Sequence, residues 1–151
     1  MKKYDCLFIG NAIIDVVANV SFEFLKDQNI DVGSWRPTTL DEISQLQNKM
    51  ENILVASGGS AANSAVGFSL LGGKSSFIGR VKADEFGELY VKDLQDANVD
   101  FVSSAVSDGD ETGRCLVYVT PDAQRSMRTY LGAASNLSPD EINDSSVEES
   151  E

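Results

Sequence analysis

The sequence contains no histidine among its 151 residues. This absence excludes histidine-based catalytic triads, histidine metal sites and histidine general bases. Any catalysis must therefore use carboxylates, lysine, arginine, serine, threonine or cysteine. Cysteine is scarce too, since Cys6 and Cys115 each lie in an apolar run and form no C-x-x-C pair. We expect both to be buried, reduced thiols, with no disulfide framework and no metal site.

Positive charge is also scarce. The chain has 12 lysine and arginine residues against 24 acidic residues, so its formal net charge is −12. This balance argues against nucleic acid or an anionic membrane as a partner, because both need basic residues to replace counterions. The sequence also lacks an apolar run of membrane-spanning length and a signal-peptide pattern at Met1. We therefore expect a cytoplasmic protein with one globular unit.

Apolar periodicity predicts an α/β fold. The run 6–9 is short and unalternating, as expected of a central strand in a parallel sheet. After a strand at 52–56, the stretch 57–104 alternates helix, strand, helix and strand, with a helix cap at Asp84. This order predicts βαβ units in a parallel sheet covered by helices.

Two further regions suggest a second, smaller sheet. The runs 112–120 and 124–131 are β-rich and flank Pro121-Asp122-Ala123, which predicts an antiparallel hairpin. The strand at 13–20 is expected to join it. Between these regions we expect a short helix at 21–26, an irregular stretch through Trp35 and Pro37, and a helix capped by Thr39.

A glycine pair marks the most informative turn, Ser57-Gly58-Gly59-Ser60-Ala61-Ala62-Asn63. Glycine lets a ligand approach main-chain N–H groups closely, and Ser60 is predicted to be the N-cap of the following helix. Asn63 would lie in the first turn, where its amide can both donate and accept. The spacing matches neither a P-loop nor G-x-G-x-x-G. A tight strand-to-helix turn without a ligand is the alternative interpretation.

Five ordered blocks match one family pattern, namely Gly10-Asn11-Ala-Ile-Ile-Asp15, Gly58-Gly59-Ser60-Ala61-Ala62-Asn63-Ser64-Ala65 with Gly72, Asp84-Glu85-Phe86-Gly87, Thr112-Gly113 and Arg125-Ser126. From about residue 4 to about residue 142, the chain resembles the amino-terminal half of the ribokinase-like (PfkB) carbohydrate kinases, within the adenosine-kinase-like branch. One departure is Lys82, where the longer family signature usually has glycine.

The resemblance implies a ribokinase-like fold, in which a three-layer α/β sheet with helices on both faces carries a small β lid. The lid strands are expected near 13–20 and 112–131. The implied activity is ATP-dependent phosphorylation of a sugar or nucleoside hydroxyl, so the expected partner is a small molecule. In the family the lid closes over this substrate and excludes water, which favours transfer over ATP hydrolysis.

The resemblance also assigns roles residue by residue. Asp15 is similar to the carboxylate that accepts hydrogen bonds from two ribose hydroxyls, and a charged acceptor with two oxygens suits a vicinal diol. The other implied substrate-binding residues are Asn11, Gly58, Gly59, Ser60 and Asn63. As alternatives, Asp15 is a turn residue at a strand end and Asn63 a local helix-start hydrogen bonder. Arg125 either reaches toward phosphate or is a solvated charge.

The catalytic base of the family lies in a later motif, Gly-Ala-Gly-Asp, which is absent here; Gly132-Ala133-Ala134 has no Asp after it. We therefore expect no catalytic residue in this chain, and we expect ATP and Mg²⁺ to serve the full-length kinase without binding these 151 residues alone. The stop after a newly begun helix would leave an exposed sheet edge, so we expect more chain to follow.

Three hypotheses remain at this point. The chain is a fragment of a sugar or nucleoside kinase, a half-length protein that binds a nucleoside or partner without catalysis, or an unrelated Rossmann-like binder. The last lacks the glycine fingerprint in its first turn. The choice among adenosine, ribose and fructose stays open, as does oligomeric state, since lid sheets in this family either stay exposed or pair in a homodimer.

Overall fold

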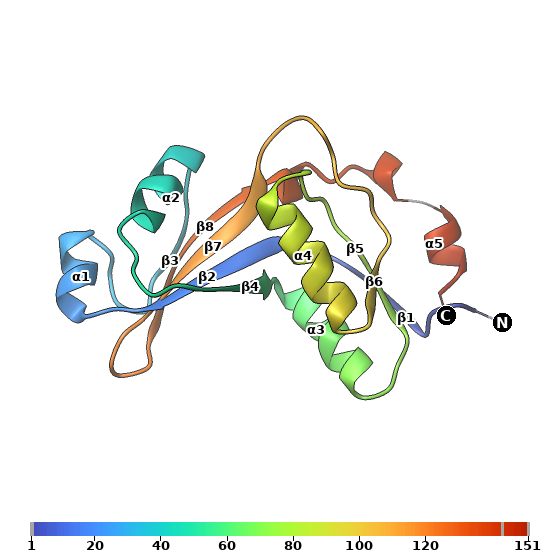
Figure 1. The fold of residues 1–151 in the computed structure, drawn as a ribbon, viewed down its shortest axis with the longest axis horizontal. Helices are drawn as coiled ribbons and strands as arrows, with labels where there is room; N and C mark the ends of the chain where they lie inside the picture. The colour runs from blue at the N-terminus through green and yellow to red at the C-terminus, as the bar shows by residue number, and fades with distance from the viewer. Residues whose placement is uncertain (1, 143, 151) are drawn as a thin grey trace.

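The computed structural model describes residues 2–142 and 144–150, which form an elongated molecule with a sheet toward each end (Figure 1). The parallel sheet has the order β1-β5-β6, from β1 (Cys6–Ile9), β5 (Ser75–Ile78) and β6 (Val99–Phe101). The mixed sheet has the order β3-β8-β7-β2-β4, from β2 (Ile13–Asn19), β3 (Trp35–Pro37), β4 (Leu54–Gly58), β7 (Thr112–Val119) and β8 (Arg125–Gly132).

Among the described residues, the run 6–9 does not occupy the central position predicted for it. β1 is parallel to its neighbour but lies at one end of the sheet, and its residues are partly exposed. β5 occupies the middle, with a strand on either side, and all four of its residues are buried. An unalternating apolar run therefore indicated a parallel sheet correctly but did not indicate the position of the strand within it.

Two helices pack on the parallel sheet, α3 (Ser60–Leu70) and α4 (Glu85–Asp96). The Phe77 ring of β5 lies 6.1 Å from the Tyr90 ring of α4 and 6.2 Å from the Phe101 ring of β6. As predicted, Asp84 caps α4, since its Oδ1 accepts a hydrogen bond from the Gly87 amide at 2.8 Å. These contacts make the aromatic centre of the core.

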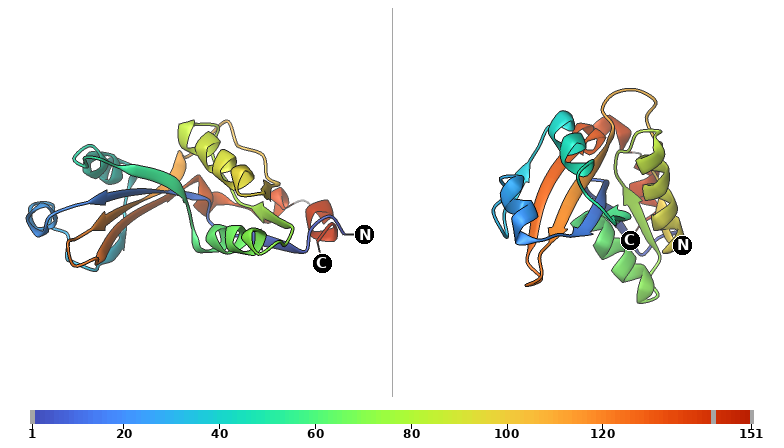
Figure 2. Two further views of the ribbon diagram at one scale, coloured as in Figure 1. Left: turned by 60° about the horizontal axis from the view of Figure 1, so that its bottom comes forward. Right: turned by 60° about the vertical axis from the view of Figure 1, so that its left-hand side comes forward.

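One face of the mixed sheet is covered by α1 (Phe22–Asp27) and α2 (Leu40–Gln47), as Figure 2 shows. The predicted cap Thr39 is confirmed, because its side chain accepts a hydrogen bond from the Glu42 amide. Ser21, predicted as the first residue of a short helix, is the N-cap of α1 and accepts from the Phe24 amide. β2 alternates: Ile14, Val16 and Ala18 are fully buried toward the helices, and the residues between them are less buried. The other face of the sheet carries no helix among the described residues.

The mixed sheet is larger than the sequence predicted. The hairpin β7–β8 is antiparallel as expected, but the stretch predicted to be irregular contributes β3, which is parallel to β8. The strand expected to lead into the parallel sheet is β4, and it pairs antiparallel with β2 instead. Pairing partners are set by contacts between distant parts of the chain, which local patterns do not contain.

After β8, short helical segments return the chain to the parallel sheet: η1 (Ala133–Asn136), η2 (Pro139–Glu141) and α5 (Asp144–Glu148). Arg80 forms an ion pair with Glu141, and Ser138 begins η2 with a capping box. Both cysteines are free thiols. Cys115 is buried as predicted, but Cys6 is partly exposed because β1 is an edge strand. No helix among the described residues has the length and apolarity needed to cross a bilayer.

Candidate functional site

The candidate site lies where the two sheets meet. β1 leads through Gly10 and Asn11 into β2, and β4 leads through Gly58 and Gly59 into α3. The antiparallel pairing of β2 with β4 places Ile13 opposite Gly58, so the two connections are neighbours in space. The structure thus brings together Asn11, Asp15, Gly58 and Gly59, while Ser60 and Asn63 follow on the first turn of α3.

The carboxyl group of Asp15 lies directly against the backbone of Gly58. A Cβ atom at residue 58 would come within 2.4 to 2.6 Å of the three carboxyl atoms of Asp15, so any other residue there would displace this carboxyl group or the strand. Burial raises the pKa of Asp15, and the positive charge of Arg125 partly offsets this rise. The site therefore presents a poorly solvated carboxylate, which gains from any ligand that donates hydrogen bonds to it.

Gly59 makes the second close approach. Its φ of +93° is favourable only for glycine, and a Cβ atom there would lie 2.7 Å from the carbonyl oxygen of Asn11. Gly59 is also the N-cap of α3, so the prediction of Ser60 as N-cap is wrong. Serine and glycine both occur at N-caps, and here the unusual backbone angle decides between them. No side chain caps this helix start.

The side chains of Asn11, Ser60 and Asn63 are exposed at this junction. The Asn63 amide nitrogen donates to the Gly59 carbonyl at 2.9 Å, which is an ordinary helical hydrogen bond of the main chain. This bond does not involve the side-chain amide of Asn63. The uncapped start of α3 and these polar side chains could together bind a hydroxyl-rich ligand.

A line of side chains crosses the uncovered face of the mixed sheet from Asp15. Cys115 of β7 is in register with Asp15, and Thr129 of β8 is in register with Cys115. The Thr129 hydroxyl donates to the Cys115 sulfur at 3.2 Å and accepts from the Trp35 indole N–H at 3.0 Å. Burial raises the pKa of the Cys115 thiol, and the charge of Asp15 raises it further. The Cys115 thiol is therefore uncharged where it lies beside Asp15 on this face of the sheet.

Sequence reasoning missed Trp35 and Thr129. Trp35 is 60 % exposed although its N–H is bonded, because it belongs to the edge strand β3. The signal that could have found Thr129 is the alternation within 125–132, which places residues 125, 127 and 129 on one face of a strand. The register with β7 and β3 was not readable from the sequence.

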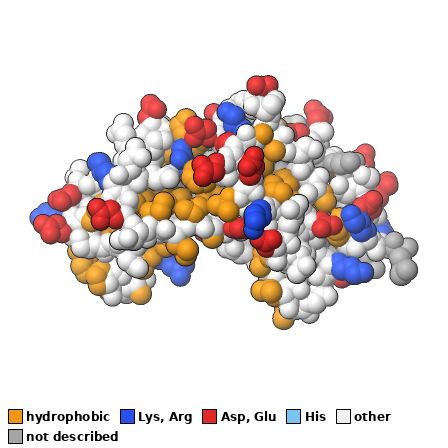
Figure 3. Space-filling view, viewed as in Figure 1, with side chains coloured by type: hydrophobic (Ala, Val, Ile, Leu, Met, Phe, Trp, Pro, Cys, Tyr) orange, Lys and Arg blue, Asp and Glu red, His pale blue; other side chains and the backbone are white. Residues whose placement is uncertain are grey.

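Arg125 lies on the same uncovered face. It lines a hollow of about 390 Å³ whose other walls include Asp15, Val17, Val117 and Met127. Figure 3 shows hydrophobic side chains in a band over the part of the molecule where Figure 1 draws β2 and β4. Asp15 and Arg125 are thus the charged groups of an otherwise apolar hollow.

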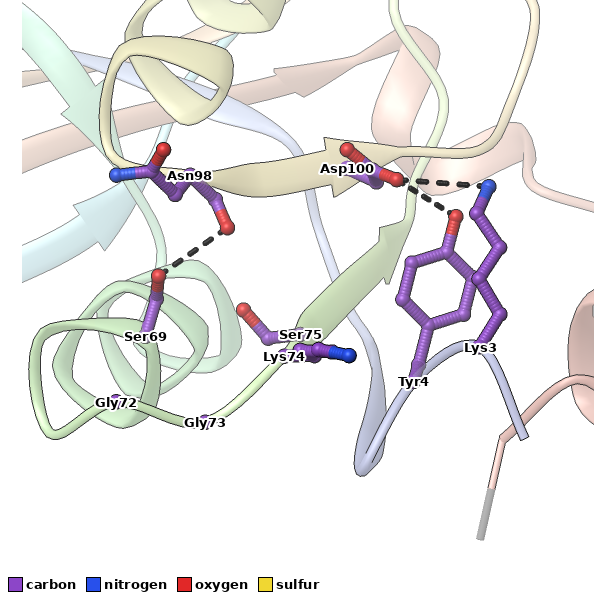
Figure 4. Close-up of a pocket in the computed structure, with 9 residues that line it drawn as sticks. All are labelled: Lys3, Tyr4, Ser69, Gly72, Gly73, Lys74, Ser75, Asn98 and Asp100. Carbon is purple, nitrogen blue, oxygen red and sulfur yellow. Dashed lines mark hydrogen bonds and ion pairs between the residues drawn. The ribbon is translucent and has the colours of Figure 1, made fainter. Parts of the chain in front are cut away.

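A second hollow, of about 410 Å³, lies at the opposite, amino-terminal ends of the parallel strands (Figure 4). Its polar groups bond to one another: the Tyr4 hydroxyl donates to Asp100 at 2.8 Å, and the Ser69 hydroxyl donates to the Asn98 carbonyl at 3.1 Å. Residues 2–142 and 144–150 contain no group of three metal-ligating side chains.

Comparisons with known proteins agree on one family. Residues 5–151 match the pfkB family carbohydrate kinase model. Adenosine kinase from Sinorhizobium meliloti superimposes with a TM-score of 0.90 at 38 % identity, covering 98 % of this chain and 45 % of that one. A probable sugar kinase from Rhizobium etli CFN 42 also gives 0.90, at 34 % identity, covering 99 % and 46 %.

Among curated proteins, probable fructokinase-6, chloroplastic, of Arabidopsis thaliana is 37 % identical over 82 residues, which are 54 % of this chain and 21 % of that protein. The chain thus spans under half the length of these relatives and structures. The family match nevertheless covers nearly all of this sequence, and the two-sheet fold agrees with it. The chain belongs to the PfkB family of carbohydrate kinases.

Proposed function

We propose that this protein acts in the ATP-dependent phosphorylation of a sugar or nucleoside hydroxyl and that the described residues form its substrate-binding part. The observation that carries the proposal is the Asp15 carboxyl group, which lies against Gly58 on an uncovered and largely apolar sheet face. A half-buried carboxylate gains from hydrogen-bond donors, and two neighbouring hydroxyls of a sugar ring supply them in the right geometry.

The neighbouring groups extend this role. Asn11 and Asn63 present exposed amide side chains, which can donate to and accept from further hydroxyls. Gly58 and Gly59 leave the backbone bare, so a flat polar ligand can approach it closely. The mixed sheet is the proposed lid. Its apolar face would exclude water from the reacting hydroxyl when it covers the substrate.

Mg²⁺ commonly binds through one or two carboxylates together with the phosphates of its substrate, whereas the Asp15 carboxyl group is here proposed to face sugar hydroxyls. We therefore assign these residues to substrate binding and to water exclusion. The relatives include both adenosine kinases and fructokinases, so an assay with both classes of substrate decides between a nucleoside and a hexose.

The test uses the natural gene product with MgATP and either adenosine, ribose or fructose, and it measures ADP formation. Asp15→Ala should raise the KM of the accepted substrate about 10- to 100-fold, as expected for losing hydrogen bonds to a charged group. Asp27→Ala, which removes an exposed carboxylate at the end of α1, is the control and should leave KM unchanged.

Two results would contradict the proposal. An unchanged KM for Asp15→Ala would remove Asp15 from the site. Binding of a nucleoside without any ADP formation would instead favour a non-catalytic binding protein.

A further inference from the structure

A carboxylate from helix α4 closes the outer edge of strand β4. The Ser57 amide donates a hydrogen bond of 2.8 Å to Oδ2 of Asp93, in a partly buried position. β4 is the last strand of the mixed sheet, so among the described residues no further strand pairs with its outer edge. An unpaired backbone N–H there would be costly, and Asp93 supplies the missing acceptor.

The helix itself gives no reason for aspartate at position 93. Aspartate is a poor helix former in a helix interior, because its side chain competes for backbone hydrogen bonds. The next acidic residue of α4, Asp96, forms an ion pair with Lys92 one turn earlier. Asp93 forms no such ion pair within the described part of the chain, and its carboxylate accepts a hydrogen bond from the Ser57 amide instead.

The bonded amide directly precedes the two glycines of the candidate site. Gly58 lies against the Asp15 carboxyl group, and Gly59 lies against the Asn11 carbonyl. Both approaches are so close that a Cβ atom would overlap the facing group. A small displacement of β4 would therefore change the position of the Asp15 carboxyl group. The Asp15–Ala56 pair is next to the Ile14–Ser57 pair in the ladder.

Helix α4 is anchored in the core and can therefore hold strand β4 in a fixed position. Tyr90 and Leu94, which flank Asp93, are fully buried in the core. At the start of the helix, Asp84 also accepts hydrogen bonds from the amide and hydroxyl of Thr112 on β7, at 2.9 and 2.7 Å. The helix and its cap thus contact the mixed sheet at two strands, and Asp93 makes the contact with the strand that leads into Gly58 and Gly59.

We propose that Asp93 is a positioning residue for the substrate site: by holding the Ser57 amide it fixes the outer edge of β4, and through Gly58 and Gly59 it fixes Asp15 and Asn11. The inference rests on the proposed substrate role of Asp15. Asp93 does not line the hollow at Asp15, so its proposed effect is on substrate binding and not on the chemical step.

The kinetic test compares Asp93→Ala, Asp93→Asn and Asp96→Ala in the natural gene product, with whichever of adenosine, ribose and fructose the wild type phosphorylates. Asp93→Ala should raise KM about tenfold with kcat changed less than about twofold. Asp93→Asn keeps an oxygen acceptor and should restore most of the affinity. Asp96→Ala should match the wild type. Equal KM for wild type and Asp93→Ala, or equal loss in Asp93→Asn and Asp93→Ala, would overturn the proposal.

A second measurement separates this proposal from the proposed function. Hydrogen exchange of the peptide backbone over 54–60 should become about tenfold faster in Asp93→Ala and stay unchanged in Asp96→Ala. Accelerated exchange in a protein that phosphorylates none of the three compounds would support the role of Asp93 in holding the strand and reject the kinase activity. Unchanged exchange in Asp93→Ala would overturn the proposal whatever the activity.

Discussion

The parallel sheet and the mixed sheet differ in how their two faces are used. In the parallel sheet the central strand β5 is buried at every residue, and its aromatic neighbours pack around Phe77. In the mixed sheet β2 buries only alternate residues under α1 and α2, while the opposite face carries Asp15 and the exposed Trp35. Packing decides the residues of the first sheet. The helix-free face of the second also buries Cys115 and Thr129, but it carries charged and exposed side chains at its margins, Asp15 and Arg125 among them.

The glycines also differ between the candidate site and helix α3. At Gly58 and Gly59 an added Cβ atom would overlap groups of the candidate site, so the absence of a side chain serves the site. At Gly67, in the middle of α3, an added Cβ atom would meet nothing within 4 Å. A glycine in this sequence is therefore informative only when its surroundings are known.

The largest expected effect tests the core against the uncovered face. Phe77→Ala should lower the free energy of unfolding by about 3–5 kcal/mol, because it opens a cavity among buried rings. Trp35→Ala, the matched aromatic change on the uncovered face, should cost less than about 1 kcal/mol. Urea unfolding followed by far-ultraviolet circular dichroism measures both. Equal losses would show that the uncovered face is as important for stability as the core.

Gly58→Ala should have the next largest effect. The added methyl group overlaps the Asp15 carboxyl group, so either the side chain or the strand must move, at a cost of about 1–3 kcal/mol in unfolding free energy. Substrate affinity should fall together with stability. Urea unfolding and substrate titration of the same sample check this prediction, and retained affinity would mean that Asp15 does not need its present position.

Asp15→Asn should change how stability depends on pH. Burial raises the pKa of Asp15 above its ordinary value of 3.8, so the folded state keeps this proton to a higher pH than the unfolded state does. Between the two pKa values the folded state binds more protons, and stability therefore falls as the pH rises through this window. The variant lacks this fall and should be more stable than the wild type above the window.

Unfolding midpoints in urea, measured at a series of pH values from below the ordinary pKa of Asp15 to neutrality, test this prediction. Parallel pH profiles for the two proteins would show that Asp15 is not destabilised by its surroundings. Weaker substrate binding in the more stable variant would identify Asp15 as a residue kept for function at a cost in stability.

The smallest expected effect is an increase in stability. Gly67→Ala replaces a poor helix former where space is open, and it should raise the unfolding free energy by about 0.5–1 kcal/mol without changing substrate affinity. It is the matched control for Gly58→Ala. A loss of affinity in Gly67→Ala would extend the site along α3.

The elements that sequence predicted correctly depend on local chemistry. Thr39 and Asp84 were recognised as caps because a capping hydrogen bond links residues only a few positions apart. The β7–β8 hairpin was recognised for the same reason. The membership of β4 in the mixed sheet was missed, because pairing with β2 depends on packing between distant segments.

The candidate site follows the same rule. Asp15 and the glycine pair were singled out from their blocks, but the contact between the Asp15 carboxyl group and Gly58 required the strand register. Asp93 gave no signal at all, since a carboxylate on an amphipathic helix resembles any solvated surface residue. Its bonding to Ser57 is visible only in three dimensions.

Trp35 has a further consequence, because it is the sole tryptophan of the sequence and it lies on the uncovered face. The emission of this indole reports on its local polarity, and no second tryptophan in these 151 residues obscures the signal. The protein therefore carries a built-in optical probe at the edge of its candidate site. Ligand arrival there can be followed by intrinsic fluorescence, without a label and without any knowledge of the reaction.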